Sequence, residues 1–569
     1  MFKSETKICQ NCKIKFKIEP EDFEFYKKIG VPTPTFCPEC RMMRRLAFRN
    51  DRNLYKRKCD FSNKEIFTMF PPEAKVKVYD SKILYSNEWD LGKYARDYNF
   101  NKTFFKQFQE LREQVPWPSR SCDRMIESDY CMNAQGLKDC YLVFSSSENE
   151  DCFYCYGLAY SRDCYDSAYL AKCELCYEAF ESAACYKTFF SSYCEGCRDI
   201  LFSTSCNNCQ NCFGCINLRH KKYHIFNKPY SKEEYFKKIK EFNLSSLKNF
   251  LFFNEKAKKL WLEFPHRFAH SSNNKNITGE NIYNSKNIFD SYTISRSEDL
   301  RYCEFLFRAK DAYDYSDWGG EAELVYEVVS SGSGISKLKF CFLCTDDCRD
   351  MEYCIQCSDS SHLFGCVGLD HKQYCILNKQ YTKESFDKLR IKIIKHMDEM
   401  PYLDKKGLIY KYGEFFPIEL SLFSYNETIA QEHFPLTKEQ ALEQGYRWYD
   451  KSKSEYKATL KAKDLPDNIK DIDNKILKEV IACSNENCTS SGFFRLLAKE
   501  LKFYQKHNIP LPRLCPECRY QERIKQRNPM KLWHRKCMKK GCDTEFETSY
   551  APERKEIIYC EECYNKEVG

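Results

Sequence analysis

The sequence predicts a mainly β protein with α-helical caps, in which zinc ribbon or treble-clef modules at both ends flank two tandem parallel β-helices. Three patterns support this fold class: paired cysteines near each end, cysteines that recur at a fixed interval in the middle, and a segment that repeats at an offset of 151. With 569 residues, the chain is too long for one hydrophobic core. The expected domains are an N-terminal zinc module (1–98), a helical linker (99–121), a first solenoid with its cap (122–262), a second solenoid with its cap (263–400), a helical linker region (401–480) and a C-terminal double zinc module (481–569).

The paired cysteines at the ends have the spacing of zinc sites. Two short pairs separated by about 15–25 residues are typical of a tetrahedral site with four thiolate ligands, because each short turn points two sulfurs at one ion. Such a site is closed and leaves no coordination position for catalysis. Packed thiols or disulfides are the alternative. Three sets fit, and each predicts a structural Zn2+ ion: Cys9, Cys12, Cys37 and Cys40; Cys483, Cys488, Cys515 and Cys518; and Cys537, Cys542, Cys560 and Cys563.

The two ends are copies of one another. The string CPECR occurs near both ends at an offset of 478, and the register continues through Cys59 before it slips by two residues. In the slipped register, Ser62 and Asp80 stand where the C-terminal copy has Cys542 and Cys560. The N-terminal module is therefore expected to keep one zinc site and to have lost the second, with Cys59 left as a packed thiol.

The middle of the chain is a short repeat. Cysteines recur at a constant interval from Cys131 through Cys152 to Cys215, and each unit divides into a longer and a shorter part, as at Cys164. A fixed period is typical of a stacked solenoid, and short aromatic patches separated by Asp, Ser, Asn and Gly favour strands and turns. We predict a parallel β-helix with about one turn per 21 residues, whose buried cysteines stack as ladders about 4.8 Å apart. The dense run Cys206, Cys209, Cys212 and Cys215 leaves metal binding open as an alternative at that end.

The solenoid is itself duplicated. A string that begins FGC occurs twice at an offset of 151, and both copies run into amphipathic helical sequence, 231–242 and 382–397, with Ser231 and Thr382 as N-caps. We interpret this element as a cap that closes the open edge of each solenoid. The His and Asn residues that keep their places in both copies are interpreted as turn residues rather than metal ligands or catalytic groups: His220, His371, Asn227 and Asn378.

Charge is segregated along the chain. Residues 41–58 carry a net charge of +7 and residues 519–540 carry +8, whereas residues 122–215 carry −8. A basic stripe on a small zinc module is typical of proteins that bind the phosphate backbone of RNA or DNA. A solvated helix, or docking of these tracts on the chain's own acidic solenoid, are the alternatives. The candidate nucleic-acid contacts are Arg41, Arg44, Arg45, Arg49, Arg57, Lys58, Arg519, Arg523, Arg527, Arg535 and Lys536.

Composition argues against several classes of protein. No apolar run reaches the roughly 18 residues of a membrane helix, and the first residues lack the apolar core of a secretory signal. An intracellular, cytoplasmic protein without a membrane partner is expected. In that compartment, thiols bind metal more often than they form disulfides.

Three long strings carry a resemblance to a known family. FYKKIGVPTPTFCPECRMMRRLAFRNDRNLYKRKC, FFKQFQELREQVP and FGCVGLDHKQYCILNKQYTKESF resemble an uncharacterised Cys-rich zinc-ribbon family of bacteria with reduced genomes. The resemblance extends over nearly the whole chain, and the lost second N-terminal site is the departure from it. It implies little about activity, because no biochemical function is established for that family.

The function that these patterns favour is a non-catalytic zinc-binding scaffold that binds RNA or DNA, or belongs to a ribonucleoprotein, through basic zinc modules on a rigid solenoid. A protein-interaction scaffold that docks a partner on the aromatic solenoid faces is the alternative. A β-helix enzyme that acts on polysaccharide is a lesser alternative, because Asp139, Asp151 and Asp163 recur at even spacing but at turn-like positions. A thiol-redox or metal-storage role is the least favoured.

Overall fold

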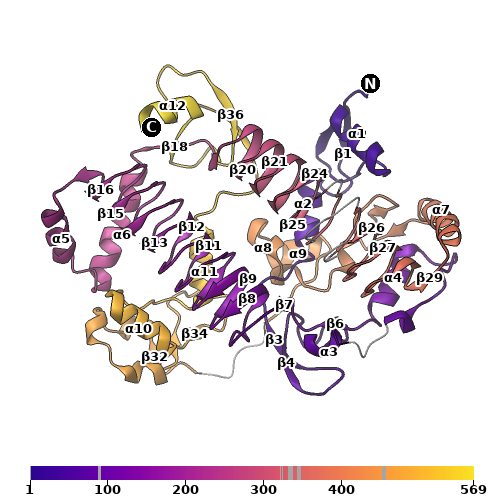
Figure 1. Ribbon diagram of the computed structural model, residues 1–569, viewed down its shortest axis with the longest axis horizontal. Helices are drawn as coiled ribbons and strands as arrows, with labels where there is room; N and C mark the ends of the chain where they lie inside the picture. The colour runs from indigo at the N-terminus through magenta and orange to yellow at the C-terminus, as the bar shows by residue number, and fades with distance from the viewer. Residues whose placement is uncertain are drawn as a thin grey trace.

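The computed structural model describes residues 2–86, 91–320, 322, 325–330, 338–342, 348–451 and 457–568 (Figure 1). It confirms the predicted fold class, because the chain is mainly β, with stacked parallel coils, helical caps and cysteine-bearing modules near both ends. Among the described residues, no helix combines the length and the apolar character needed to cross a membrane.

The first solenoid has short coils. Phe153 pairs in parallel with Tyr141 of the preceding coil and with Tyr165 of the next. The longer turn predicted from the cysteine interval is therefore wrong. The strands are β7 (Cys122–Asp123), β8 (Met132–Lys138), β9 (Tyr141–Glu150), β10 (Phe153–Tyr156), β11 (Ala168–Ala171), β12 (Phe180–Ala183), β13 (Tyr186–Phe189), β14 (Arg198–Leu201), β15 (Gln210–Phe213) and β16 (Lys222–Ile225).

Each coil consists of four sides of three residues. Every third residue points inward, as Val143 and Ser146 do, and every third residue turns a corner with a positive φ, as Asp151 does (52°). The N–H of Asp151 donates to the carbonyl of Lys138 in the coil before it (3.1 Å), which offsets the strain of a non-glycine residue in the left-handed region. The interval from Cys131 to Cys152 thus spans seven sides of three residues each. Because a coil has four sides, this interval is longer than one coil.

Inward side chains stack as ladders, with one member from each successive coil. One ladder holds Cys140, Cys152, Cys164 and Cys176, which are at most 3% exposed. Their thiols donate to backbone carbonyls, as Cys152 does to Ser161 (3.7 Å). The cysteines of the described residues form no disulfide with one another; Cys344 lies outside those residues. The predicted ladders of buried thiols are present, at the shorter period.

The second solenoid repeats this architecture. Most of its coils have the same length as those of the first. The first pairings, such as Lys275 with Lys286, span one residue fewer, and Ser316, Val329, Phe342 and Ile355 pair in succession with one extra residue per coil. Its strands are β19 (Ser271–Ser272), β20 (Lys275–Tyr283), β21 (Lys286–Ser295), β22 (Glu298–Arg301), β23 (Glu304–Phe307), β24 (Lys310–Tyr313), β25 (Ser316–Gly319), β26 (Arg349–Glu352), β27 (Ser361–Phe364) and β28 (Gln373–Ile376).

The helical caps that the sequence predicts close both solenoids, and each cap also contains a hairpin. The first cap consists of β17 (Lys228–Pro229), α5 (Lys232–Glu241) and α6 (Leu247–Trp261), and the second consists of β29 (Lys379–Gln380) and α7 (Lys383–Glu399) (Figure 1). Ser231 and Thr382 cap α5 and α7 by accepting a hydrogen bond from a backbone N–H. The side chains of Asn227 and Asn378 bond both backbone groups of a residue in the last coil, which makes them turn residues.

The end modules each contain two treble clefs, in which a hairpin is followed by a helix. The N-terminal module comprises β1 (Glu5–Ile8), β2 (Lys15–Ile18), α1 (Pro20–Ile29), α2 (Pro38–Leu46), β3 (Tyr55–Lys58), β4 (Glu65–Thr68), β5 (Val78–Tyr79) and α3 (Ser81–Leu84). The C-terminal module comprises β33 (Ile481–Ala482), β34 (Phe493–Phe494), α10 (Ala498–His507), α11 (Pro516–Ile524), β35 (Trp533–Lys536), β36 (Glu545–Thr548), β37 (Ile557–Tyr559) and α12 (Glu561–Val568).

Short elements connect these parts. They are η1 (Leu91–Tyr94), α4 (Phe104–Arg112), β6 (Trp117–Pro118), β18 (Pro265–Arg267), β30 (Tyr402–Leu403), β31 (Ile409–Tyr410), η2 (Ile418–Leu420), η3 (Tyr425–Glu427), α8 (Ile429–His433), α9 (Lys438–Glu443), β32 (Leu460–Lys461), η4 (Ala462–Asp464), η5 (Ile469–Asp471) and η6 (Asn474–Lys478).

Each end module bridges both solenoids in a crossed arrangement. In the N-terminal module, α2 packs on the second solenoid, whereas β5 pairs with β6, which leads into the first solenoid (Figure 1). In the C-terminal module, α11 packs on the first solenoid, whereas β37 pairs with β18, which leads into the second. The two modules therefore hold the solenoids together in equivalent ways.

Candidate metal centres and the buried arginine contacts

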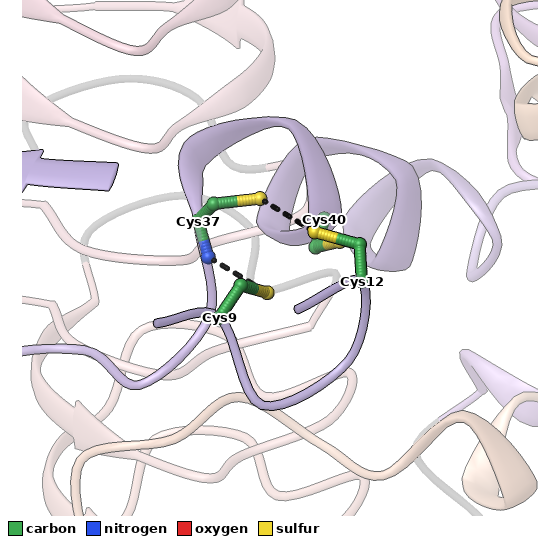
Figure 2. A group of neighbouring side chains, drawn as sticks. All are labelled: Cys9, Cys12, Cys37 and Cys40. Atoms are coloured by element: carbon green, nitrogen blue, oxygen red, sulfur yellow. Dashed lines mark hydrogen bonds between the residues drawn. The ribbon is translucent and has the colours of Figure 1, made fainter. Parts of the chain in front are cut away.

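The first cysteine cluster is formed by one hairpin and one helix. Cys9 and Cys12 lie in the turn between β1 and β2, Cys37 is the N-cap residue of α2, and Cys40 lies in the first turn of that helix (Figure 2). All four sulfurs lie within 4.8 Å of one another. The N–H of Cys37 donates to the sulfur of Cys9 (3.3 Å), and the sulfurs of Cys12 and Cys37 are 3.6 Å apart. The positive end of the α2 dipole and this N–H both favour thiolates here.

The second cluster has the same geometry in the C-terminal module. It contains Cys483, Cys488, Cys515 and Cys518, all within 4.8 Å of one another. The N–H of Cys515 donates to the sulfur of Cys483 at the same distance of 3.3 Å, and the sulfurs of Cys488 and Cys515 are 3.7 Å apart. A side-chain amide, that of Asn485, donates to the sulfur of Cys518 (3.2 Å).

The third cluster lies in the second clef of the same module. Cys537, Cys542, Cys560 and Cys563 lie within 4.8 Å of one another, and the sulfurs of Cys542 and Cys560 are 3.9 Å apart. The hydrogen bond with the side chain of Thr544 lowers the pKa of Cys542 to about 6, which favours the thiolate form that a metal needs. All twelve predicted ligands are thus brought together in three groups of four, each of which could hold a metal ion.

The second clef of the N-terminal module keeps the backbone geometry of a site without its ligands. The N–H of Asp80 donates to the sulfur of Cys59 at 3.3 Å, as the N–H of Cys560 does to the sulfur of Cys537. Ser62 lies in the hairpin turn, and its N–H also donates to the sulfur of Cys59 (3.4 Å). Among the described residues no group of four metal ligands forms here.

Two further groups of potential ligands do not form a closed site. Cys206, Cys209, Cys212 and Cys215 lie on four successive sides of one coil, and among the described residues no three of them have sulfurs mutually within 4.8 Å. Asp359, Asp370 and His371 do lie that close together, but they are exposed, and Asp370 already contacts His371 (2.9 Å) and Ser358 (2.7 Å).

The basic tract of the N-terminal module is buried against carboxylates of the second solenoid. Arg41 and Arg45 both contact Asp314, at 3.0 and 2.8 Å. Arg45 also reaches Glu304 (2.9 Å), and Arg44 contacts Glu327 (2.8 Å). These three arginines are at most 2% exposed.

The C-terminal module makes the equivalent contacts with the first solenoid. Arg519 and Arg523 both contact Asp166, at 2.9 and 3.3 Å. Arg523 also contacts Glu178 (2.9 Å). Asp166 is fully buried, so its two guanidinium partners supply the compensation that a buried carboxylate requires.

The hypothesis that these arginines bind nucleic acid is therefore wrong for the buried members of the set, and docking on the chain's own solenoid is what they do. Four of the remaining candidates bond to other groups of the chain, and two are exposed lysines. Arg49 pairs with Asp51, Arg57 pairs with Asp60, and the side chain of Arg527 donates to Tyr169. Arg535 donates to two backbone carbonyls, whereas Lys58 and Lys536 are exposed, the latter beside Asp543.

A different basic surface was not predicted from the sequence. The segment from Arg219 to Lys259, here named the basic cap, contains twelve Lys or Arg residues and four Glu residues, a net charge of +8. Eleven of the twelve are exposed. Within the described part of the chain, Lys259 and Glu255 make the one ion pair of this segment (2.7 Å). A comparison of the two caps would have found it, because residues 370–410, which lie at the offset of 151, carry a net charge of only +3.

No protein-family model, curated protein or solved structure matches the chain.

Proposed function

We propose that the three cysteine clusters hold structural zinc. A regular tetrahedron of sulfurs about 2.3 Å from a central ion has edges of about 3.8 Å, and the sulfur pairs at 3.6, 3.7 and 3.9 Å fit that edge. Four thiolates satisfy the ion completely, so the expected contribution is to folding rather than to catalysis. Metal analysis of the purified protein tests this. Three zinc ions per chain would support the proposal, whereas iron, or five or more zinc ions, would overturn it.

We further propose that the protein is a non-catalytic scaffold that binds nucleic acid through the basic cap. The observation that carries this proposal is the excess of exposed positive charge on the first cap, which includes the additional helix α6, over that on the second cap. Such a surface attracts a polyanion mainly by releasing the counterions of its phosphates. The zinc modules contribute indirectly in this proposal, because their buried arginines fix the two solenoids relative to each other.

A salt titration with a labelled 20-nucleotide RNA tests the basic cap. The variant R219D/K222Q transplants the residues of the second cap, Asp370 and Gln373, which the same coil geometry already accommodates. We expect about a tenfold or greater loss of affinity at low salt and a smaller dependence of affinity on salt.

The matched control is K58Q/K536Q, which removes two exposed lysines of the zinc modules and is expected to leave RNA affinity unchanged. Absence of salt-dependent binding in the unmodified protein, or an equal loss in the control variant, would contradict the proposal. Equal binding of anionic vesicles and RNA would assign the surface to lipid instead.

A further inference from the structure

Planar and basic side chains form a continuous stripe that leads into the basic cap. Tyr186, Arg198, Gln210 and Lys222 are register partners in successive coils, on strands β13 to β16. Because neighbouring strands of a sheet lie about 4.8 Å apart, these side chains follow one another at that spacing on one face of the first solenoid. The face is solvent-accessible, because Arg198 and Lys222 are exposed and Tyr186 is half-buried.

Aromatic rings continue the stripe onto the cap helix. Tyr223 follows Lys222 at the corner of the coil, and its ring packs edge-on against Phe236 of α5, with ring centroids 6.2 Å apart. Phe236 is 48% exposed. The ammonium of Lys238 on α5 lies over the ring of Tyr230, which follows the hairpin strand β17 (5.3 Å from the ring centroid). A half-exposed phenylalanine among lysines leaves an apolar ring face available to a flat, negatively charged ligand.

The end of the stripe that lies farthest from the cap already shows the stacking that such a ligand would use. The guanidinium of Arg198 lies over the ring of Tyr186, 4.8 Å from its centroid. Stacking of this kind is how arginine and aromatic side chains hold unpaired bases, whereas a duplex presents only its phosphates and groove edges to a convex surface.

We propose that the basic cap and this stripe bind single-stranded rather than double-stranded nucleic acid, with lysines on the phosphates and with Tyr186, Tyr223 and Phe236 as stacking positions for bases. This inference rests on the proposed nucleic-acid function. The duplicated cap sharpens it, because Phe236 is replaced by Asp387 and Lys222 by Gln373, while Tyr223 is kept as Tyr374. The second cap therefore lacks both the lysine and the exposed ring at these two positions.

Fluorescence anisotropy with a labelled 12-nucleotide single strand and the 12-base-pair duplex of the same sequence tests the inference on the full-length protein. We expect the single strand to bind at least tenfold more tightly than the duplex. Phe236→Leu keeps an apolar side chain on α5 but removes the ring, so it should weaken single-strand binding about five- to tenfold. It should leave duplex binding and the salt dependence unchanged, because no charge is altered.

The matched control is Phe307→Leu, at an exposed phenylalanine of the second solenoid that also lies beside two arginines, Arg296 and Arg308. It should change neither affinity. Equal affinity for strand and duplex, or an equal loss of both in the Phe236→Leu variant, would overturn the inference while leaving the nucleic-acid function intact. Absence of salt-dependent binding to both probes would instead overturn the proposed function itself.

Discussion

The two end modules are copies that differ in how their second clefs are held together. The C-terminal clef has four cysteine sulfurs within 4.8 Å, whereas the N-terminal clef retains only Cys59. Both keep the same N–H to sulfur hydrogen bond of 3.3 Å and the same parallel pairing to the strand that enters a solenoid. Beside the N-terminal clef, Trp117 and Phe70 are fully buried and pack edge-to-face. A treble clef can therefore keep its shape without a metal when neighbouring chain supplies an apolar core.

Removing the matching cysteine from each second clef should give the largest contrast. Cys537→Ser, at the counterpart of Cys59, should reduce the zinc content from three ions to two and destabilise the protein by about 5 kcal/mol or more, because the free energy of metal binding is lost from folding. Cys59→Ser should leave three ions and cost about 1 kcal/mol. Metal analysis and denaturant unfolding of both variants measure this contrast, and equal effects would show that the two clefs do not differ as described.

The docking contacts should be equivalent in the two modules. Asp166→Ala and Asp314→Ala each leave two buried arginines without a shared partner, so each should destabilise the protein by about 3–5 kcal/mol. Asp163→Ala, at a more exposed carboxylate one side of the coil away, serves as the control and should cost less than about 0.5 kcal/mol. Denaturant midpoints measure all three. If only one of the two buried aspartates mattered, the symmetry of the crossed docking would be refuted.

The C-terminal side of the junction should have a pH dependence of its own. The C-terminal copy has Pro529 at the position of Asp51 in the N-terminal copy. On this side, the carboxyl of Glu181 in the first solenoid accepts a hydrogen bond from the side chain of Asn281 in the second (3.1 Å). Burial raises the pKa of Glu181 to about 8. A carboxyl whose pKa is higher in the folded chain binds its proton more tightly there, so stability falls as the pH rises from about 4 through 8.

Glu181→Gln should therefore increase the free energy of unfolding at pH 8 by about 1–3 kcal/mol and flatten its dependence on pH. Unfolding measured at pH 5 and pH 8 checks this. At pH 5 the variant and the unmodified protein should differ little, because both side chains are then uncharged. A variant that is less stable at pH 8 would mean that Glu181 is stabilising as an anion.

The smallest effect on stability is expected from rebuilding the lost site. Ser62→Cys, Asp80→Cys and Ile83→Cys together place thiols at the positions of Cys542, Cys560 and Cys563, beside Cys59. We expect a fourth zinc ion but a gain of only about 1 kcal/mol in the presence of zinc, since this clef already folds. Metal analysis decides the point. A protein that still binds three ions would show that the clef has drifted from site geometry.

Spacing in the sequence was sufficient to predict the twelve cysteines of the three clusters, the caps with Ser231 and Thr382, and the lost fourth site. Ligand spacing and helix capping are local, so no knowledge of packing is needed. The coil length was mispredicted because cysteine, serine, alanine and leucine all occupy inward positions. The interval between cysteines alone is therefore a whole number of three-residue sides, but it is not the length of a coil. The even spacing of Asp139, Asp151 and Asp163 did carry the true period, since each of them turns the same corner of its own coil.

Whether a basic residue is buried or exposed could not be predicted from the number of basic residues around it. Arg41 and Arg45 are as basic in sequence as Lys221 and Lys222, but the former are buried beside Asp314 and the latter are exposed. The difference depends on which carboxylates lie opposite, far away along the chain, and nothing in local sequence encodes that pairing. The excess charge of the first cap over the second was visible, but only once the duplication was used to compare charge as well as motif.

The crossed docking has a consequence for the ribosome that makes this chain. Arg45 meets Asp314 only after a further 269 residues have been synthesised. At about 5–20 residues per second that interval lasts roughly 15–50 s. During this time Arg41 and Arg45 of α2 lack their carboxylate partner Asp314, and the growing acidic solenoid beside them is not the one on which α2 finally docks. Synthesis therefore cannot complete this fold domain by domain, because the first solenoid gains its contacts with α11 only when the C-terminal module emerges.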